Sequence, residues 1–262
     1  YALRLLSQFG NEDDQETVLR LTAYLLSQQM TEQRGFEPSH PAYGGWGFGE
    51  KNLPAGSPGH VDLSHTRRVV EALQVVAVDN TVLQAAQAYL RRVQKLDGVT
   101  GSPETGYDGG FFASTVVPGV NKGGSEARPD SLGSFYRSYA TATSDGILAL
   151  RAAGVAPTDR RVADALEWLR QHPDLEVPAG VPPESAIRWD HVMFYYHLYS
   201  RAEVYSIYGG PDGWNSDILE ILASKQRSDN SYSNPAGSPN KEDDPLIAST
   251  FVVHALLRTL GS

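Results

Sequence analysis

The 262-residue sequence predicts an all-α domain built from successive helical hairpins. Apolar residues recur at helical spacing along most of the chain, alternating runs typical of strands are nearly absent, and one helical pattern returns four times. With 40% hydrophobic and 20% charged residues, the composition is typical of a folded globular protein. No run of about 18 apolar residues occurs, so no transmembrane segment is expected.

Four similar segments are expected to form the first helix of each hairpin. Each has a bulky aromatic residue or Ile followed by Leu, and three of the four place Gln five residues after the bulky position. The segments are residues 22–29, 87–94, 166–173 and 219–226. Their starts lie 65, 79 and 53 residues apart, so the repeat carries insertions of variable length.

A second helix is expected to follow in each repeat, over residues 62–73, 139–150, 189–199 and 244–256. Small and apolar residues occur all round these helices, which predicts an inner layer buried on both sides. Residues 1–9 are expected to be the second helix of an earlier hairpin. The sequence therefore predicts one domain over 1–262, with repeats near 14–78, 80–154, 158–208 and 212–260.

Glycine and aromatic residues follow the first helix at equal distance in two repeats. Gly45 lies sixteen residues after Gln29, and Gly110 lies sixteen residues after Gln94. Such turns use the backbone freedom of glycine while the neighbouring aromatic ring packs between helices. A long irregular insertion from Pro118 to Ser134 is expected to form a lid or a binding surface.

A Gln, a Gly-rich or Asp-Gly turn, an aromatic residue and a helix carrying Thr and Ala-Leu together resemble the repeat of the prenyltransferase and squalene oxidase family. The match is best in the last repeat, over residues 225–234 and 242–250. The resemblance implies an α/α toroid, as a partial or complete ring, with inner helices around a central cavity and outer helices outside. Squalene–hopene cyclases and protein farnesyltransferase beta subunits use that cavity for isoprenoids, which implies an apolar, isoprenoid-like ligand here.

The catalytic motifs of that family are degenerate in this chain. Protein prenyltransferases hold zinc with an Asp, a Cys and a His, but the chain has no cysteine and only a partial match in His254 after Asp244. A zinc-bound thiolate mechanism loses an essential ligand in this way. We therefore expect no metal and no cofactor.

The Asp-x-Asp-Asp motif of the cyclases is matched only by residues 241–244, where Lys241 replaces the first Asp. Asp243 would be the proton-donating acid, although the adjacent ammonium favours its ionised form. Asp244 precedes Pro245, which is typical of a helix N-cap followed by Pro at the first helical position.

Asp145 is the strongest single candidate, because it lies within an inner helix among Ala, Thr and Gly. A carboxylate there is costly unless it is paired or lines a wet cavity. We treat Asp145 and Asp243 as the candidate catalytic residues. A buried hydrogen bond from Asp145 to a neighbouring helix is an equal alternative.

Other candidate ligand-binding residues gather at the starts of the inner helices and on the third one. Acid and imidazole groups at one rim suit general acid–base chemistry or, alternatively, helix capping. Aromatic rings can stabilise cations, stack on an apolar or sugar ligand, or simply pack between layers. The candidates are Asp62, His65, Asp190, His191, Tyr195, Tyr196, Tyr199 and His254.

Charge and composition limit the partners. The net charge is −9 and the pI about 5.2, which argues against a nucleic-acid partner. The leading hypothesis is a terpenoid cyclase/prenyltransferase-like domain of unassigned activity that binds an apolar small molecule. The alternatives are a non-catalytic structural module with a protein partner, and a toroid enzyme acting on isoprenoids or polysaccharides. The chain begins at Tyr1 rather than Met, so a trimmed or processed N-terminus is expected and the compartment stays open.

Overall fold

The computed structural model describes residues 1–50, 53–54, 56–100, 102–129 and 133–261, which are mostly helical. Their α-helices are α1 (Ala2–Phe9), α2 (Gln15–Ser27), α3 (Leu63–Gln74), α4 (Asn80–Val93), α5 (Ala140–Ala152), α6 (Arg160–Gln171), α7 (Trp189–Val192), α8 (Phe194–Tyr208), α9 (Trp214–Lys225) and α10 (Pro245–Leu260). Short 3-10 turns cover Glu12–Asp14, Glu32–Arg34, Gly98–Thr100, Glu104–Gly106, Pro118–Val120 and Ser238–Asn240. The predicted all-α class is confirmed.

One small antiparallel hairpin interrupts the helical pattern. Strands β1 (Ser125–Ala127) and β2 (Ser134–Tyr136) pair with Glu126 opposite Phe135. The hairpin lies at the end of the predicted insertion, of which residues 130–132 fall outside the described residues. None of the helices in the described part of the chain is both long and apolar enough to cross a membrane.

The helices occur where the repeat pattern predicts them. Helices α2, α4, α6 and α9 match the expected first helices, and α3, α5, α8 and α10 match the second ones. The expected helix over 189–199 is divided at Met193, which separates α7 from α8. Helix α1 occupies the segment expected to end an earlier hairpin.

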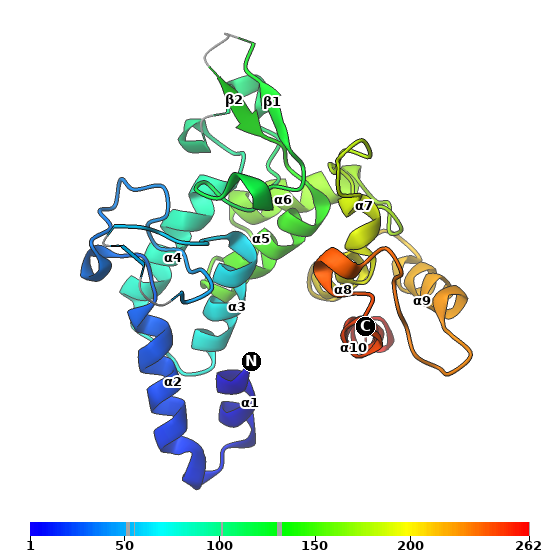
Figure 1. Cartoon of the computed structure of the whole chain (residues 1–262), viewed down its shortest axis with the longest axis horizontal. Coiled ribbons are helices and arrows are strands. Elements are labelled where there is room, and N and C mark those ends of the chain that lie inside the picture. Colours follow the sequence, from blue (N-terminus) through cyan, green and yellow to red (C-terminus); the bar gives the residue numbers. More distant parts are fainter. Residues whose placement is uncertain (51–52, 55, 101, 130–132, 262) are drawn as a thin grey trace.

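The long helices form two rows. In one row, which we call the inner row, α1, α3, α5, α8 and α10 contact one another in that order. In the other row, the outer row, α2, α4, α6 and α9 pack against inner-row helices. Figure 1 shows that the series curves, with α1 and α10 at its two ends. The hydrophobic core runs through the contacts between the rows.

Aspartate side chains start four of these helices by accepting backbone hydrogen bonds. Asp62, Asp79, Asp159 and Asp244 cap α3, α4, α6 and α10 in this way. Asp244 accepts from the Leu246 amide at 2.8 Å, with Pro245 in the first turn. The predicted N-cap at Asp244 is therefore confirmed.

The sixteen-residue spacing that follows both Gln29 and Gln94 has a direct structural cause. The side-chain amide of Gln29 donates to the carbonyl oxygens of Gly44 at 3.1 Å and of Val82, in the first turn of α4, at 3.0 Å. Gly44 has φ +85°, and a Cβ atom there would lie 1.7 Å from the Ala85 carbonyl oxygen. Gln29 thus joins the end of α2 to the turn and to the next outer helix, and only glycine fits the turn.

Gln94 makes the same two bonds one repeat later. Its amide donates to the carbonyl oxygens of Gly109 at 2.9 Å and of Arg161, in the first turn of α6, at 2.7 Å. We call each of these arrangements a glutamine clasp. In the last repeat the clasp is missing among the described residues, because the amide of exposed Gln226 donates to Asn230 within its own loop.

The prediction that the inner helices are buried on all sides is confirmed for α5 but wrong for α10. Every residue of α5 except Arg151 is buried. On α10, Leu246, Val253, Leu257 and Leu260 are exposed. The physical reason is position: α10 ends the series, so α8 and α9 cover only part of its circumference.

Candidate functional site

A pocket of about 590 Å³ lies between α1 and α10, with α3 and α8 behind it. Apolar and aromatic side chains from three helices line much of it: Leu5, Tyr199, Ile247 and Phe251. The rings of Tyr199 and Phe251 stack, with centroids 5.7 Å apart and planes 16° from parallel. The volume falls within the range of roughly 300–1,000 Å³ that small-molecule sites occupy. We call this space the inner pocket.

Polar side chains line another part of the inner pocket. Arg258 lies 3.4 Å from a carboxylate oxygen of Glu203, and Arg68 donates to the Tyr199 hydroxyl at 2.9 Å. The ring of His254 lies 5.6 Å from that of Tyr199. Burial lowers the pKa of His254, which favours its neutral imidazole. The pocket therefore combines an apolar wall with a hydrogen-bonding end.

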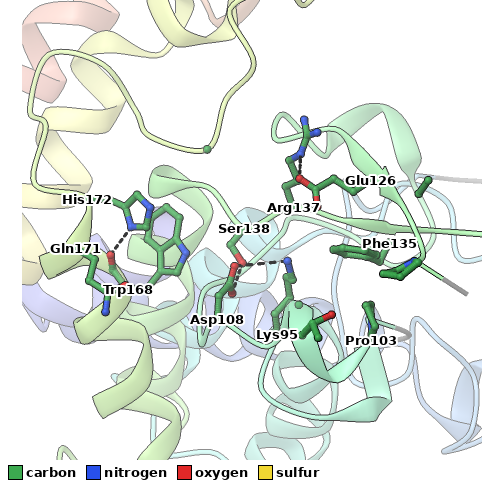
Figure 2. A pocket seen from close by; sticks show the side chains of 15 residues that line it. Lys95, Pro103, Asp108, Glu126, Phe135, Arg137, Ser138, Trp168, Gln171 and His172 are labelled. Carbon is green, nitrogen blue, oxygen red and sulfur yellow. Dashed lines mark hydrogen bonds and ion pairs between the residues drawn. The ribbon is translucent and has the colours of Figure 1, made fainter.

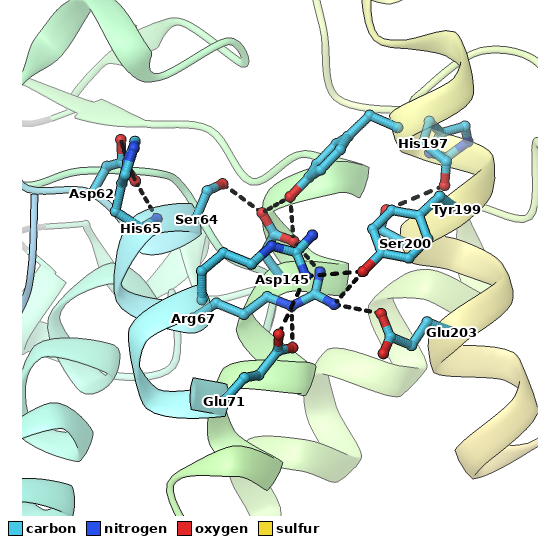
Figure 3. Close-up of polar contacts among 12 residues, drawn as sticks. Asp62, Ser64, His65, Arg67, Glu71, Asp145, His197, Tyr199, Ser200 and Glu203 are labelled. Carbon is cyan, nitrogen blue, oxygen red and sulfur yellow. Dashed lines mark hydrogen bonds and ion pairs between the residues drawn. The ribbon is translucent and has the colours of Figure 1, made fainter. Parts of the chain in front are cut away.

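A buried ion network supports this pocket from behind (Figure 3). The guanidinium of Arg67 is fully buried and pairs with Glu71 of α3, Asp145 of α5 and Glu203 of α8. Burial opposes its charge, but the carboxylates of Glu71 and Asp145 outweigh that cost and raise the pKa of Arg67. The same guanidinium holds the pKa of Glu203 below its usual value, against the opposing effect of burial. Three inner-row helices are thereby joined through one side chain.

Asp145 is enclosed by hydrogen-bond donors. Arg67 donates to its Oδ1 at 2.7 Å, Ser64 donates to its Oδ2 at 2.5 Å, and the Tyr196 hydroxyl lies 2.8 Å from both oxygens. The two carboxylate oxygens of Asp145 are therefore both engaged by side-chain donors. The geometry supports the alternative of a buried hydrogen bond to neighbouring helices, since Ser64 and Tyr196 belong to α3 and α8.

Asp62 and His65 form a separate cluster at the start of α3. Asp62 accepts from the His65 amide at 2.8 Å, and its carboxylate lies 2.9 Å from the His65 ring and 3.1 Å from His60 Nε2. Phe48 packs 4.2 Å from each imidazole. The two histidines therefore share one carboxylate that also caps the helix.

Asp190 and His191 lie together on α7, next to Arg188. Arg188 donates to Asp190 at 2.6 Å and lies 2.6 Å from His191 Nε2. The Arg188 hydrogen bond lowers the pKa of Asp190. The pair is not among the residues that line the inner pocket.

Tyr195 and Asp243 also lie away from the inner pocket. Tyr195 packs edge-to-face on Tyr232, and its backbone amide donates to Glu242 at 3.0 Å. Asp243 is exposed, whereas the neighbouring Glu242 is fully buried at the start of α8. Burial raises the pKa of Glu242, although backbone amides of α8 favour its ionised form.

Among the predicted site residues, the structure brings four together. Tyr199 and His254 line the inner pocket, and Asp145 and Tyr196 belong to the network behind it. The residues that the sequence analysis missed are Arg67, Arg68, Glu71, Glu203, Glu242 and Phe251. A signal for two of them was present, because Arg67 and Glu71 are four residues apart in a helix predicted to be buried.

The zinc chemistry of the protein prenyltransferases does not fit this chain. Within the described residues, no group of three or more His, Cys, Asp or Glu side chains could hold a metal ion. His254 instead packs beside Tyr199.

No protein-family model matches the chain, and no curated protein matches it either. Function is therefore inferred from the geometry of the pockets.

Proposed function

We propose that this chain binds an apolar, isoprenoid-like small molecule in the inner pocket. The observation that carries the proposal is the stacked pair of Tyr199 and Phe251, which faces a cavity of about 590 Å³ together with Leu5 and Ile247. Removing apolar surface from water supplies about 25 cal/mol per Å², so a long hydrocarbon gains most of its affinity from such walls.

We further propose that the helices form an incomplete α/α toroid like that of the prenyltransferase and squalene oxidase family. Three features support it: the order of contacts along the inner row, the outer helices packed against it, and the glutamine clasps at Gln29 and Gln94. In such a toroid the inner pocket would occupy the central cavity, where members of that family accept isoprenoids.

Binding is favoured over acid-initiated cyclisation. An acid that protonates an alkene has to face the substrate, yet both oxygens of Asp145 are engaged by neighbouring donors and Asp145 is not among the residues that line the inner pocket. Asp243 is exposed, so water hydrates its carboxyl group. Arg68 and the neutral His254 then orient a polar end of the ligand by hydrogen bonding.

Native mass spectrometry with added farnesol tests the proposal. We expect a one-to-one complex that survives desalting, with Phe251→Ala weakening it and Val253→Ala, on the same helix, leaving it intact. A wild-type protein that retains no farnesol and no other prenyl alcohol would overturn the proposal. Organic extraction of protein from its native source then identifies the natural ligand.

A second candidate function is favoured by the uncovered face of α10. Leu246, Val253, Leu257 and Leu260 follow one face of α10 at helical spacing and are 74%, 54%, 66% and 71% exposed. An exposed apolar helix face is typical of interaction sites. If this face binds a protein partner, Leu257→Glu should abolish that binding without weakening farnesol binding. Sedimentation velocity of the wild type and of Leu257→Glu, at matched concentrations, measures the difference in association.

A further inference from the structure

A second pocket, of about 430 Å³, lies between the end of α4, α6 and the β1–β2 hairpin. Its lining residues are all different from those of the inner pocket. Figure 2 shows Lys95, Asp108 and Ser138 at its centre, with Phe135 on one side and Trp168 on the other. We call it the hairpin pocket.

The backbone identifies Lys95 as the counterpart of Met30. The Met30 amide donates to the Gly45 carbonyl at 3.1 Å, and the Lys95 amide donates to the Gly110 carbonyl at 2.8 Å. Each residue directly follows the glutamine of its clasp. The same place in two successive repeats therefore holds Met in one and Lys in the other.

Ser138 is the counterpart of Val61 by a similar argument. A Cβ atom on Gly45 would lie 2.7 Å from Cγ1 of Val61, and one on Gly110 would lie 2.6 Å from Cβ of Ser138. The two glycines thus face equivalent residues at the start of the following inner helix.

The first repeat shows what the fold itself needs at these places. Met30 and Val61 are 2% and 0% exposed and belong to the hydrophobic core. Lys95 and Ser138 are each 4% exposed, so the second repeat buries an ammonium and a hydroxyl where the first buries apolar groups. Burying an ammonium costs free energy that a methionine does not. Packing therefore does not account for Lys95.

The contacts that the described residues make with the Lys95 ammonium offset the cost of burying it only weakly. Its nitrogen lies 3.5 Å from Oδ2 of Asp108 and 4.9 Å from the centre of the Phe135 ring. Oδ1 of Asp108 accepts from the Ser138 hydroxyl at 2.7 Å and from the Gly110 amide at 3.0 Å. An ammonium carries three donors, and this one lies among the side chains that line the pocket (Figure 2).

We propose that the hairpin pocket binds a neutral, hydroxyl-rich molecule of the sugar class. The charges that line it cancel, because Lys95 and Arg137 stand against Asp108 and Glu126. A hydroxyl group can accept from the Lys95 ammonium and can donate to the Asp108 carboxylate, which lines the same pocket. Its C–H face packs on Phe135, as apolar ligand surface does in small-molecule sites.

Other ligand classes fit this lining less well. An anion would gain from Lys95 but would be repelled by Asp108, which is 37% exposed, and by Glu126. A purely apolar molecule would give the buried ammonium no acceptor beyond the Asp108 carboxylate, 3.5 Å away. The site is independent of the proposed isoprenoid pocket.

Saturation-transfer NMR with a fixed set of sugars tests the proposal. The probes are glucose, galactose, mannose, N-acetylglucosamine, maltose and cellobiose. We expect at least one to bind wild-type protein and Lys95→Met to weaken it by about tenfold or more, which corresponds to the loss of about 1.4 kcal/mol. Met30→Leu, at the matching place in the first repeat, should leave sugar binding unchanged.

Thermal unfolding separates a binding role for Lys95 from a structural one. Lys95→Met introduces the residue that the first repeat has at this place, Met30. We therefore expect the melting temperature of the variant to equal or exceed that of the wild type. The proposal is overturned if no probe binds, if Lys95→Met binds sugar as the wild type does, or if acetate or phosphate competes for the site. Farnesol binding by Lys95→Met, measured alongside, shows whether the inner pocket is intact.

Discussion

The side-chain nitrogen of Gln94 lies 2.7 Å from the carbonyl oxygen of Arg161, and this bond joins the end of α4 to the start of α6. Its counterpart at Gln29 joins α2 to α4. Each clasp bonds one outer helix to the next, across 53 residues of the chain at Gln29 and 67 at Gln94.

Removing one clasp should destabilise the whole domain. Gln94→Ala loses two hydrogen bonds and leaves the Gly109 and Arg161 carbonyls without that donor, so we expect the free energy of unfolding to fall by about 1–3 kcal/mol. Urea unfolding followed by circular dichroism measures it. Gln226→Ala is the control, because the exposed Gln226 amide donates to the Asn230 carbonyl in its own loop. Equal effects of the two variants would refute the clasp.

Asp145→Asn should also lower stability, by about 1–3 kcal/mol, because an amide group would face donors and Arg67 would lose one of its three carboxylates. The same urea experiment applies. Asp243→Asn, at an exposed site, should leave the midpoint unchanged. A neutral effect of Asp145→Asn on both stability and farnesol binding would show that the network has no role in either.

His197 should make the protein sensitive to acid. Burial lowers its pKa to about 3, and the nearby charge of Arg201 acts in the same direction. Since an unfolded histidine titrates near pH 6.5, the unfolded chain binds the extra proton between about pH 6.5 and 3, and stability falls as the pH falls through that window. Unfolding free energies measured along this range should decline less steeply in His197→Gln.

Phe251→Ala should weaken farnesol binding by about tenfold or more, because the ring contributes apolar contact and stacks on Tyr199. Fluorescence titration of the pocket tyrosines measures the dissociation constant. Val253→Ala removes apolar surface from the same helix outside the pocket and should bind farnesol normally. If both variants bind equally well, the ligand does not occupy the inner pocket.

The repeat pattern predicted the helices because their spacing is set by local rules. Helical periodicity located α2 to α6 and α8 to α10. The sequence Asp244-Pro245 predicted the N-cap of α10. The role of Asp145 depended on partners 51 to 81 residues away, such as Tyr196 and Ser64, and no local pattern records which residues meet at that distance.

The predicted rim of acids and histidines illustrates the same limit. Asp62, Asp190 and Asp243 all lie near helix starts, but each has a different surrounding: two histidines, an arginine, and solvent. The role of Glu242 could not be predicted, because its carboxylate accepts from the backbone at the start of α8, a helix that begins 48 residues earlier in the chain. The uncovered face of α10 could not be foreseen either, since its composition is that of a buried helix.

In the first two repeats, the glutamine clasps leave one segment free to change length. Trp46 and Asp62 pair across sixteen residues, whereas Phe111 and Tyr139, which make the corresponding backbone bond, are separated by twenty-eight. The twelve extra residues include the β1–β2 hairpin and do not alter the bonds on either side of them. Natural variation can therefore add a new loop at this point, and with it a new specificity, while the helices beneath keep their positions.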